Sequence, residues 1–539
     1  MCVPFMGFID AVAGNPVYLV LLILLIIYIP TYIHVKTSPK MKERGIVPYG
    51  PFIMIKTKRG VRMLDKIARY RRFWTAFGTL SKIMAFFLMA TIILILCINV
   101  SLLPTMLRTG TGIGIEYALA IPGLNPMLPL VYGIIGLIVA VVVHEIAHGV
   151  QTRANNMKVE SMGILHAVVP MGAFVEPNDE EIRKCGRKAR STIYAAGIAV
   201  NLSLAIVLFL VMTFGMMGTL SSNFGGNAAV VNVTAGSPAD DSGIGFSSVI
   251  WGVQTDVSDP GSLTTFTPMN YIDMMNYNFT PGDEYLIRYA TESNPNNYSI
   301  VRMGVFIEGV AKGSPADAAG IKPKSFIMSV DGVPISNISS FRDIMASWDP
   351  NVKGYMEIEI CEYQGGSLKG PETLVVYPDN NNGTAFLGVF LTFSGFNFTT
   401  PDIMLEMIKN PLYGAESLSE AALAAVSYIG KPFRGYSPMP AEIQWWYGSS
   451  IMGDQAFWIV VQAMFWIFWL NLVLGVTNAL PAVPFDGGYL LKDGVGAIVD
   501  RTHKDSTPEK REMIENGVTR TVSYATLFIL MMVMIAILF

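Results

Sequence analysis

The chain has 539 residues, of which 52% are hydrophobic and 15% are charged, whereas about a quarter of the residues in an ordinary soluble protein are charged. The mean hydropathy of +0.44 excludes a purely soluble globular protein. The 38 lysines and arginines are balanced by 41 acidic residues, so the net charge of −3 provides no basic surplus that would favour a nucleic-acid partner.

Six stretches of the chain are candidates for transmembrane helices, since a bilayer span needs about 20 mostly apolar residues. They cover residues 17–33, 83–103, 128–150, 193–217, 457–480 and 522–539. The first stretch could instead be a signal peptide, but no basic residues precede it and no small-residue cleavage site follows it. The sequence therefore predicts a polytopic α-helical membrane protein with about six transmembrane helices.

Basic residues in the connecting segments indicate how the predicted spans are oriented. Segment 34–82 contains thirteen lysines and arginines and segment 151–192 contains seven, whereas none precedes residue 17. Loops rich in lysine and arginine usually face the cytoplasm, so both termini and segment 218–456 are expected outside it. Six N-x-Ser/Thr sequons in that segment agree with this orientation: Asn232, Asn278, Asn297, Asn337, Asn382 and Asn397.

The extracytoplasmic segment contains an internal repeat. Val-Thr-Ala-Gly-Ser-Pro-Ala-Asp at 233–240 returns as Val-Ala-Lys-Gly-Ser-Pro-Ala-Asp at 310–317, 77 residues later. A Gly-Ser-Pro-Ala turn that opens a short helix, followed by strands around a Val-Asp-Gly-Val-Pro turn, resembles a PDZ domain. Two inserted PDZ-like α+β domains are therefore predicted, at 226–304 and 305–393. The alternative is a pair of purely structural β-domains.

The clearest chemical motif is His144-Glu145-Ile-Ala-His148, in the third predicted span. Residues four apart lie on one face of a helix, so both imidazoles can bind one cation and Glu145 can reach a water bound to it. The four cysteines lack C-x-x-C spacing, so a metal here needs histidine and carboxylate ligands, and zinc is the expected metal. A polar seam between helices that binds no metal is the alternative.

A catalytic zinc also needs a third protein ligand and an open position for water. Asp486 is the most plausible carboxylate, because it lies in Asn478-Ala-Leu-Pro-Ala-Val-Pro-Phe-Asp-Gly-Gly at the cytoplasmic end of the fifth predicted span. Prolines and glycines break the helix there and expose backbone groups that lipid cannot satisfy. The third and fifth spans run in the same direction, so His148 and Asp486 are expected near the same membrane face. A loop that only caps the helix is the alternative.

Together these features resemble the site-2 protease family of zinc intramembrane metalloproteases, of the archaeal type with extracytoplasmic PDZ domains. The resemblance rests on four motifs in the family's order: the motif at 144–148, Gly-Ala-Phe-Val-Glu-Pro at 172–177, Ala-Gly-x-x-x-Asn at 196–201 and the segment 478–488. It implies that His144, His148 and Asp486 bind one Zn²⁺, that Glu145 is the catalytic base, and that Asn478 helps to hold the substrate backbone.

The segment Met-Gly-Ala-Phe-Val-Glu at 171–176 is too short to span a membrane and is rich in strand formers. We expect it to be a re-entrant strand that pairs with an unwound substrate helix. Its candidate substrate-binding residues are Gly172, Ala173, Phe174 and Val175. An ordinary interfacial loop is the alternative.

The expected function is hydrolysis of peptide bonds within or near transmembrane segments by a zinc-activated water, with Glu145 as general base, in regulated intramembrane proteolysis. The expected partners are the lipid bilayer and transmembrane substrates trimmed beforehand by another protease, which the PDZ pair sorts by size or by a newly exposed end. The alternative is a non-proteolytic membrane metal-binding protein or a PDZ-based adaptor. The intact Glu145 argues against it, because binding zinc needs no general base.

The predicted domain order follows from these assignments. Residues 1–127 hold the first two helices and a basic cytoplasmic loop, and residues 128–217 hold the first part of the protease core. The two PDZ-like domains come next, and 394–456 is an amphipathic or interfacial segment, either a cover over the outer membrane face or a loop on the lipid headgroups. Residues 457–539 hold the second part of the core. The protein is expected in the plasma membrane, with the PDZ region extracytoplasmic and the active site near the cytoplasmic side.

Overall fold

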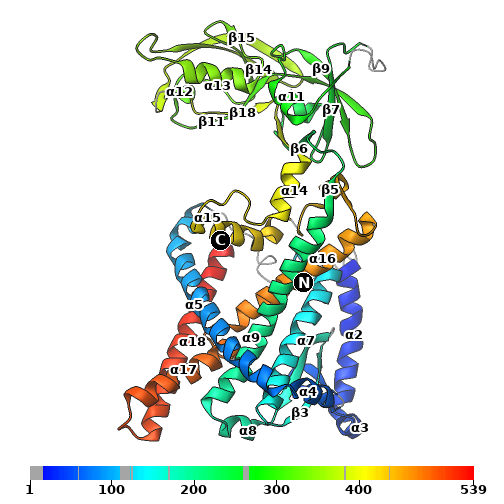
Figure 1. The fold of residues 1–539 in the computed structure, drawn as a ribbon, viewed down its shortest axis with the longest axis vertical. Helices are drawn as coiled ribbons and strands as arrows, with labels where there is room; N and C mark the ends of the chain where they lie inside the picture. The colour runs from blue at the N-terminus through cyan, green and yellow to red at the C-terminus, as the bar shows by residue number, and fades with distance from the viewer. Residues whose placement is uncertain are drawn as a thin grey trace, which may run out of the picture. The chain divides into compact units, whose positions relative to one another are not determined.

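The computed structural model describes residues 16–58, 60–109, 122, 125–167, 170–258, 266–381, 384–435 and 437–538, and Figure 1 shows its elements. The predicted sequon at Asn382 lies outside the described residues. The chain divides into two compact units. The helical unit comprises Met1–Gly215, Ile429–Pro438 and Ile459–Phe539, and the β-rich unit comprises Met216–Tyr428 and Met439–Trp458.

Five helices of the described chain are long and apolar enough to cross a membrane. They lie within α5 (Arg71–Thr109), α7 (Leu130–Ala154), α9 (Arg187–Leu210, continued by η1, Val211–Met216, and η2, Met217–Thr219), α16 (Asp454–Asn478) and α18 (Pro508–Leu538). These helices correspond to the second to sixth predicted spans. In α2 (Pro16–Thr37), the apolar stretch Leu22–Thr37 is shorter, so a sixth span remains a prediction.

The outer surface of α5 suits contact with lipid. Ile83, Phe87 and Leu94 are 65%, 73% and 60% exposed. Soluble proteins rarely leave such a row of large apolar side chains uncovered, whereas a helix in a bilayer requires one. Five apolar helices of this kind characterise a membrane protein.

The inner face of the bundle packs around α9. Ala195 and Ile198 of α9 lie in one buried cluster with Ala85 of α5 and Leu490 of α17 (Asp486–Thr502). Helix α7 also runs along α9. Small residues allow membrane helices to approach closely, which explains the alanines at these contacts. Helix α9 is therefore the common support of α5, α7 and α17.

A four-stranded antiparallel sheet joins the basic segment after α2 to the chain that follows α7. Its order is β1 (Ile46–Tyr49), β2 (Phe52–Thr57), β3 (Val159–His166) and β4 (Pro170–Pro177). Three short helices flank these strands in the sequence: α3 (Pro39–Glu43), α4 (Val61–Ala68) and α8 (Asp179–Lys184). Strand β4 lies at the edge of the sheet, with α7 beside it. The segment 171–176 is thus a strand, in a larger sheet than the sequence indicated.

The β-rich unit is built on a twelve-stranded antiparallel sheet, and its described residues form two large hydrophobic cores and a smaller cluster of Phe306, Phe326 and Tyr363. The elements of the first repeat are β6 (Ala228–Val233), α10 (Pro238–Asp241), β7 (Val249–Gln254), β8 (Phe266–Pro268), α11 (Tyr271–Asn276), β9 (Glu284–Ala290) and β10 (Asn297–Arg302). Those of the second are β11 (Val305–Val310), α12 (Pro315–Ala318), β12 (Ser325–Val330), β13 (Val333–Pro334), α13 (Ile338–Ser347), β14 (Met356–Gln364), β15 (Ser367–Val376), β16 (Asp379–Asn381), β17 (Thr384–Phe386) and β18 (Val389–Phe393). The last strand of the sheet is β19 (Phe396–Thr399).

The strand pairing shows that the second repeat is inserted into the first. Strand β18 pairs with β11, and the next strand, β19, returns to pair with β6 of the first repeat. Val389 of β18 lies opposite Val310. Seven residues later, Phe396 of β19 lies opposite Val233, the counterpart of Val310 in the 77-residue repeat. The predicted division of the region at residue 393 therefore differs from the structure, because β19 completes the first repeat.

The segment after the sheet, predicted to be amphipathic or interfacial, contains two helices. They are α14 (Pro401–Lys409) and α15 (Leu418–Ile429), followed by η3 (Lys431–Arg434) and η4 (Ala441–Trp446). Leu418, Leu423 and Val426 of α15 are exposed. Strand β20 (Tyr447–Ser449) then pairs with β5 (Leu220–Ser222), so the segments that enter and leave the β-rich unit are joined.

Candidate metal centre

The two histidines of α7 face one point inside the helical unit. His144 and His148 are separated by one helical turn, and their Nε2 atoms lie 3.1 Å apart. Their side chains are 8% and 13% exposed. The four-residue spacing therefore brings two ring nitrogens together, as expected for ligands of one cation.

Asp486, the first residue of α17, completes this cluster. Its Oδ2 atom lies 3.1 Å from Nε2 of His144 and 3.2 Å from Nε2 of His148. The turn between α16 and α17 is so tight that a β-carbon on Gly487 would collide with the backbone of Ala479 and Leu480, which follow α16. Glycine at this position therefore lets α17 begin where its first side chain reaches the histidines.

The three atoms form a nearly equilateral triangle that fits a metal ion. Its sides measure 3.1, 3.1 and 3.2 Å. Ligands about 2.0–2.1 Å from a tetrahedral zinc are about 3.3–3.4 Å from one another. Oδ2 of Asp486 is buried, and no described residue donates a hydrogen bond to it. Two histidines and one carboxylate are also a donor set that leaves a fourth position open for water.

Helix α9 closes one side of the cluster. A β-carbon on Gly197 would lie 2.6 Å from Cε1 of His144 and 2.6 Å from Nε2 of His148, so a larger residue would displace both rings. One turn earlier, the carbonyl oxygen of Ile193 lies 2.8 Å from Nδ1 of His148. A carbonyl can only accept, so this bond places the proton on Nδ1 and leaves Nε2 free to bind a metal.

Glu145 lies beside the triangle and is not one of its three corners. Its Oε2 atom accepts a hydrogen bond of 2.9 Å from the backbone N–H of Val175. This N–H points away from β3, and because backbone groups alternate along a strand, those of Ala173 face the same outer edge of β4. Gly172 and Phe174 occupy the alternate positions. The structure thus places the expected base next to the expected substrate-binding strand.

Asn478, expected to hold the substrate backbone, is the last residue of α16. Its side-chain nitrogen donates a hydrogen bond of 3.1 Å to the carbonyl oxygen of Leu474. This bond orients the side-chain amide at the helix end. Its role toward a substrate stays a prediction.

A lysine from the basic segment supports β4. The sequence did not indicate this contact. Nζ of Lys56 lies 2.8 Å from Oε2 of Glu176, and Ser161 donates a hydrogen bond of 2.5 Å to the same oxygen. The lysine and serine hold the pKa of the Glu176 carboxyl below its usual value. The pairing of β2 with β3 and of β3 with β4 brings these residues together, and no local pattern in the sequence indicates it.

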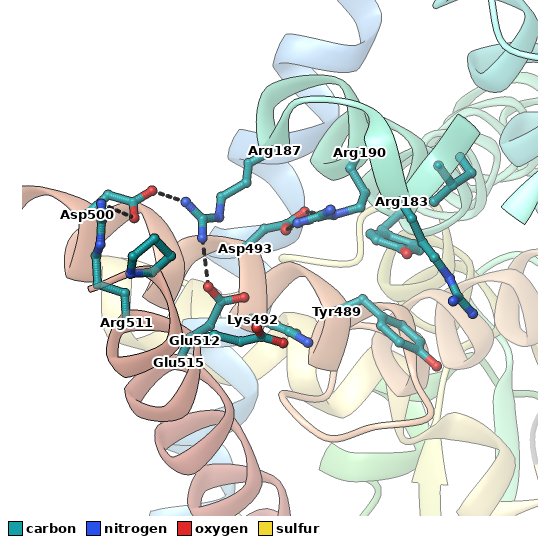
Figure 2. A pocket seen from close by; sticks show the side chains of 13 residues that line it. Arg183, Arg187, Arg190, Tyr489, Lys492, Asp493, Asp500, Arg511, Glu512 and Glu515 are labelled. Carbon is teal, nitrogen blue, oxygen red and sulfur yellow. Dashed lines mark hydrogen bonds and ion pairs between the residues drawn. The ribbon is translucent and has the colours of Figure 1, made fainter. Parts of the chain in front are cut away.

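A polar cavity of about 750 Å³ lies among α8, α9, α17 and α18 (Figure 2). Its walls carry an ionic network in which Arg187 contacts Asp500 and Glu515, while Arg190 contacts Asp493. These partners are about 300 residues or more apart in sequence, so composition and spacing could not reveal them. The cavity shares no lining residue with the metal cluster.

A helix-borne His-Glu-x-x-His motif in an apolar bundle, completed by a carboxylate, defines a class of metallopeptidases that act in membranes. The sequence matches Peptidase family M50 over residues 132–530. This range covers most of the chain and all three corners of the triangle, so the chain belongs to Peptidase family M50, the site-2 protease family.

One relative is an uncharacterized protein of Methanocaldococcus jannaschii. It is 30% identical to this chain over 200 residues, which are 36% of this chain and 51% of the relative. The chain therefore spans about half the length of this relative.

Proposed function

We propose that the protein is a zinc endopeptidase that cuts membrane-protein substrates within or near their transmembrane segments. The observation that carries this proposal is the geometry of the cluster: three potential ligands within 3.2 Å of one another, with Glu145 held just outside them. A site that only stores or transports a metal has no use for a carboxylate in that place. The fit of the triangle to tetrahedral zinc supports the choice of metal.

The residues around the cluster suit peptide hydrolysis. Zinc in such a site supplies an acidified water and polarises the carbonyl of the bond to be cut. Glu145 can take the proton of the attacking water and deliver it to the leaving nitrogen, since one of its oxygens remains available when the other accepts from Val175. Gly197 and the Ile193 carbonyl keep both histidine rings in place during this transfer.

Strand β4 is the proposed docking edge for the substrate backbone. Its outer edge faces Glu145 and is not paired with another strand among the described residues. A transmembrane helix has no free backbone groups, so its peptide bonds become accessible only after local unwinding. Pairing with the backbone of Ala173 would stabilise the unwound segment beside the base.

The second repeat of the β-rich unit is the proposed receptor for a trimmed substrate. The N–H of Ala311 donates to the carbonyl of Gly388 at 2.8 Å, so Val389 turns its own N–H and C=O toward the other edge of β18. Among the described residues, the N–H groups of Leu387 and Gly388 also have no hydrogen-bond partner. A strand edge that begins with free amides resembles a PDZ groove, which captures a peptide by strand addition.

The corresponding edge of the first repeat is already occupied by the chain itself. Phe396, the counterpart of Val389, pairs with Phe393 at the end of β18. The N–H of Ser394 donates to the carbonyl of Gly304, and that of Gly395 donates to the hydroxyl of Thr392, both at 3.1 Å. We therefore assign peptide binding to the second repeat and a supporting role to the first. The repeats would lie outside the plasma membrane, with the metal centre near its cytoplasmic side.

The test compares wild type with Glu145→Gln in detergent, on a panel of single-span membrane proteins with and without their outer domains. We expect cleavage to fall by a factor of about 100 to 10,000 while zinc content stays the same, because Glu145 is a base and not a ligand. Glu180→Gln is the matched control, since this glutamate is exposed on α8. Wild-type cleavage by a zinc-loaded Glu145→Gln variant would disprove the proposed mechanism.

A further inference from the structure

A buried ion pair joins α9 to α17 at the wall of the polar cavity (Figure 2). Asp493 is 3% exposed, and its two oxygens lie 2.9 and 3.2 Å from Nε of Arg190. Nη2 of Arg190 makes a further contact with Oδ1, and the hydroxyl of Ser191 donates to Oδ2 at 3.2 Å. A forked contact of this kind fixes both the distance and the angle between the two helices.

The pair lies two helical turns from the third corner of the metal cluster. Asp493 follows Asp486 by seven residues, so both lie on the same face of α17. Between them, the ring of Tyr489 stacks on Tyr194 of α9, with centroids 5.0 Å apart. The face of α17 that carries Asp486 is thus anchored to α9 by two successive contacts.

The same part of α9 also holds a histidine ligand. Ile193 accepts the hydrogen bond from His148, and it lies between Arg190 and Tyr194 in the sequence. One short stretch of α9 therefore contacts both the ring of His148 and the helix that bears the carboxylate. A shift of α17 along α9 would change the distance from Asp486 to the histidines directly, because a helix moves as a rigid rod over two turns.

We propose that Arg190 and Asp493 are positioning residues that set the distance of Asp486 from His144 and His148. The proposal rests on the proposed metal site and assigns no contact between the pair and the metal or substrate. Ligand distances in a metal site hold within about 0.2 Å, which is far less than the freedom of an unanchored helix end. Partners that orient ligands in this way typically change metal affinity by about 10–100-fold when they are replaced.

The test uses Co²⁺ as a spectroscopic probe in the metal-free, full-length protein in detergent. Arg190→Lys keeps the charge and removes the fork, so we expect Co²⁺ affinity about 10–100-fold weaker and altered visible absorption bands. The matched control is Arg187→Lys, in the same cavity, whose partner Asp500 lies seven residues farther from Asp486. This control should lower thermal stability without changing the Co²⁺ spectrum or affinity.

Wild-type Co²⁺ affinity and spectrum in Arg190→Lys would overturn the proposal. Equal losses in Arg190→Lys and Arg187→Lys would also overturn it, because they would show a general effect of helix packing. If Arg190→Lys does not fold, Asp493→Asn provides the same comparison with nearly unchanged side-chain volume. The Co²⁺ measurements need no substrate, so they remain valid even if the protein cleaves no peptide bond. A wild-type protein that binds no Co²⁺ would instead disprove the metal site itself.

Discussion

At the centre of the site, the two histidines differ in how their protons are placed. Nδ1 of His148 donates to the Ile193 carbonyl, so this ring presents Nε2 to the metal before the metal arrives. Nδ1 of His144 is buried without a hydrogen-bond partner among the described residues. The tautomer of His144 is therefore selected by metal binding.

Replacement of Asp486 tests the third corner. Asp486→Ala removes one of three ligands, so we expect zinc content after dialysis to fall well below one per chain, with cleavage lost in parallel. Asp505 follows Asp486 in the sequence and is exposed, so the control variant Asp505→Ala should keep full zinc content. Atomic absorption of the two purified variants measures the difference. Unchanged zinc in Asp486→Ala would place the third ligand elsewhere.

The sequence alone pointed to His144, Glu145, His148 and Asp486 because each lies in a short motif whose spacing carries chemical meaning. It could not reveal the residues that hold them. Ile193 acts through its backbone, and Asp493 through an arginine 303 positions away. Supporting residues of this kind depend on which helices pack together, and spacing within one helix says nothing about that.

Among the elements, α9 and the small sheet each contact a different part of the site. Helix α9 contacts the histidine rings through Gly197, and the sheet contacts Glu145 through β4. The sequence indicated strand character at 171–176, because strand formers are concentrated there. It did not indicate that β1 and β2 of the basic segment complete the sheet, since that pairing connects residues more than 100 positions apart.

A larger residue at position 197 should damage the metal centre selectively. In Gly197→Ala the new methyl group would lie 2.6 Å from both histidine rings, and overpacking of this degree typically costs about 1–3 kcal/mol. We expect zinc affinity to fall at least about tenfold in a folded protein. The control is Gly215→Ala, farther along the same span, where the nearest atom is 3.8 Å away. Isothermal titration with zinc distinguishes the two, and equal affinities would contradict the close approach of α9.

The contact between Lys56 and Glu176 should make the sheet sensitive to pH. The pKa of Glu176 is lowered in the folded protein, so its stabilising contribution is present above the unfolded value of about 4.3 and disappears as the pH falls through the lowered value. Lys56→Met should therefore lower the thermal midpoint near pH 7, by an amount equivalent to about 0.2–1 kcal/mol, since both side chains are partly exposed. Toward pH 3 the difference from wild type should shrink.

Lys58→Met is the matched control, because Lys58 is exposed on the same basic segment. Thermal melts of both variants at several pH values measure the effect. A pH-independent difference between Lys56→Met and wild type would mean that the lysine acts through packing and not through its charge.

On the scale of the whole molecule, the β-rich unit is a nested pair of repeats and not a tandem. The 77-residue repeat was visible in the sequence because Gly-Ser-Pro-Ala recurs. The sequence also holds a second, shorter repeat: Phe-Leu-Gly-Val at 386–389 returns as Phe-Ser-Gly-Phe at 393–396, seven residues later. These two turns place Gly388 and Gly395 against Ser314 and Ser237 of the two repeats. They could have indicated that the first repeat closes after the second.

Removal of the nested pair tests whether it selects substrates by size. The deletion must cover residues 226–399, because a cut at 395 would leave β19 without its partner β6. With a flexible linker in its place, we expect a pre-trimmed substrate to be cut almost as fast as by wild type. A substrate with the same transmembrane segment and a folded outer domain is expected to be excluded by the intact protein. The deletion variant should cut this substrate as well.

Cleavage of both substrates is compared on gels at matched zinc content. Loss of both reactions in a deletion variant that still binds zinc would show that the repeats activate the core. Continued exclusion of the large substrate would also contradict the size-selection hypothesis.

Strand β19 also has a consequence for the order of events during synthesis. The ribosome completes the first repeat's other strands at residue 302 and reaches β19 only after the whole second repeat. At about 5–20 residues per second, that interval is roughly 5–20 seconds, during which one edge of β6 has no partner. The second repeat needs no strand from outside its own contiguous segment. Although the second repeat is translated later, it can fold before the first repeat is complete. The chain that follows it then supplies β19, the strand that the first repeat still lacks.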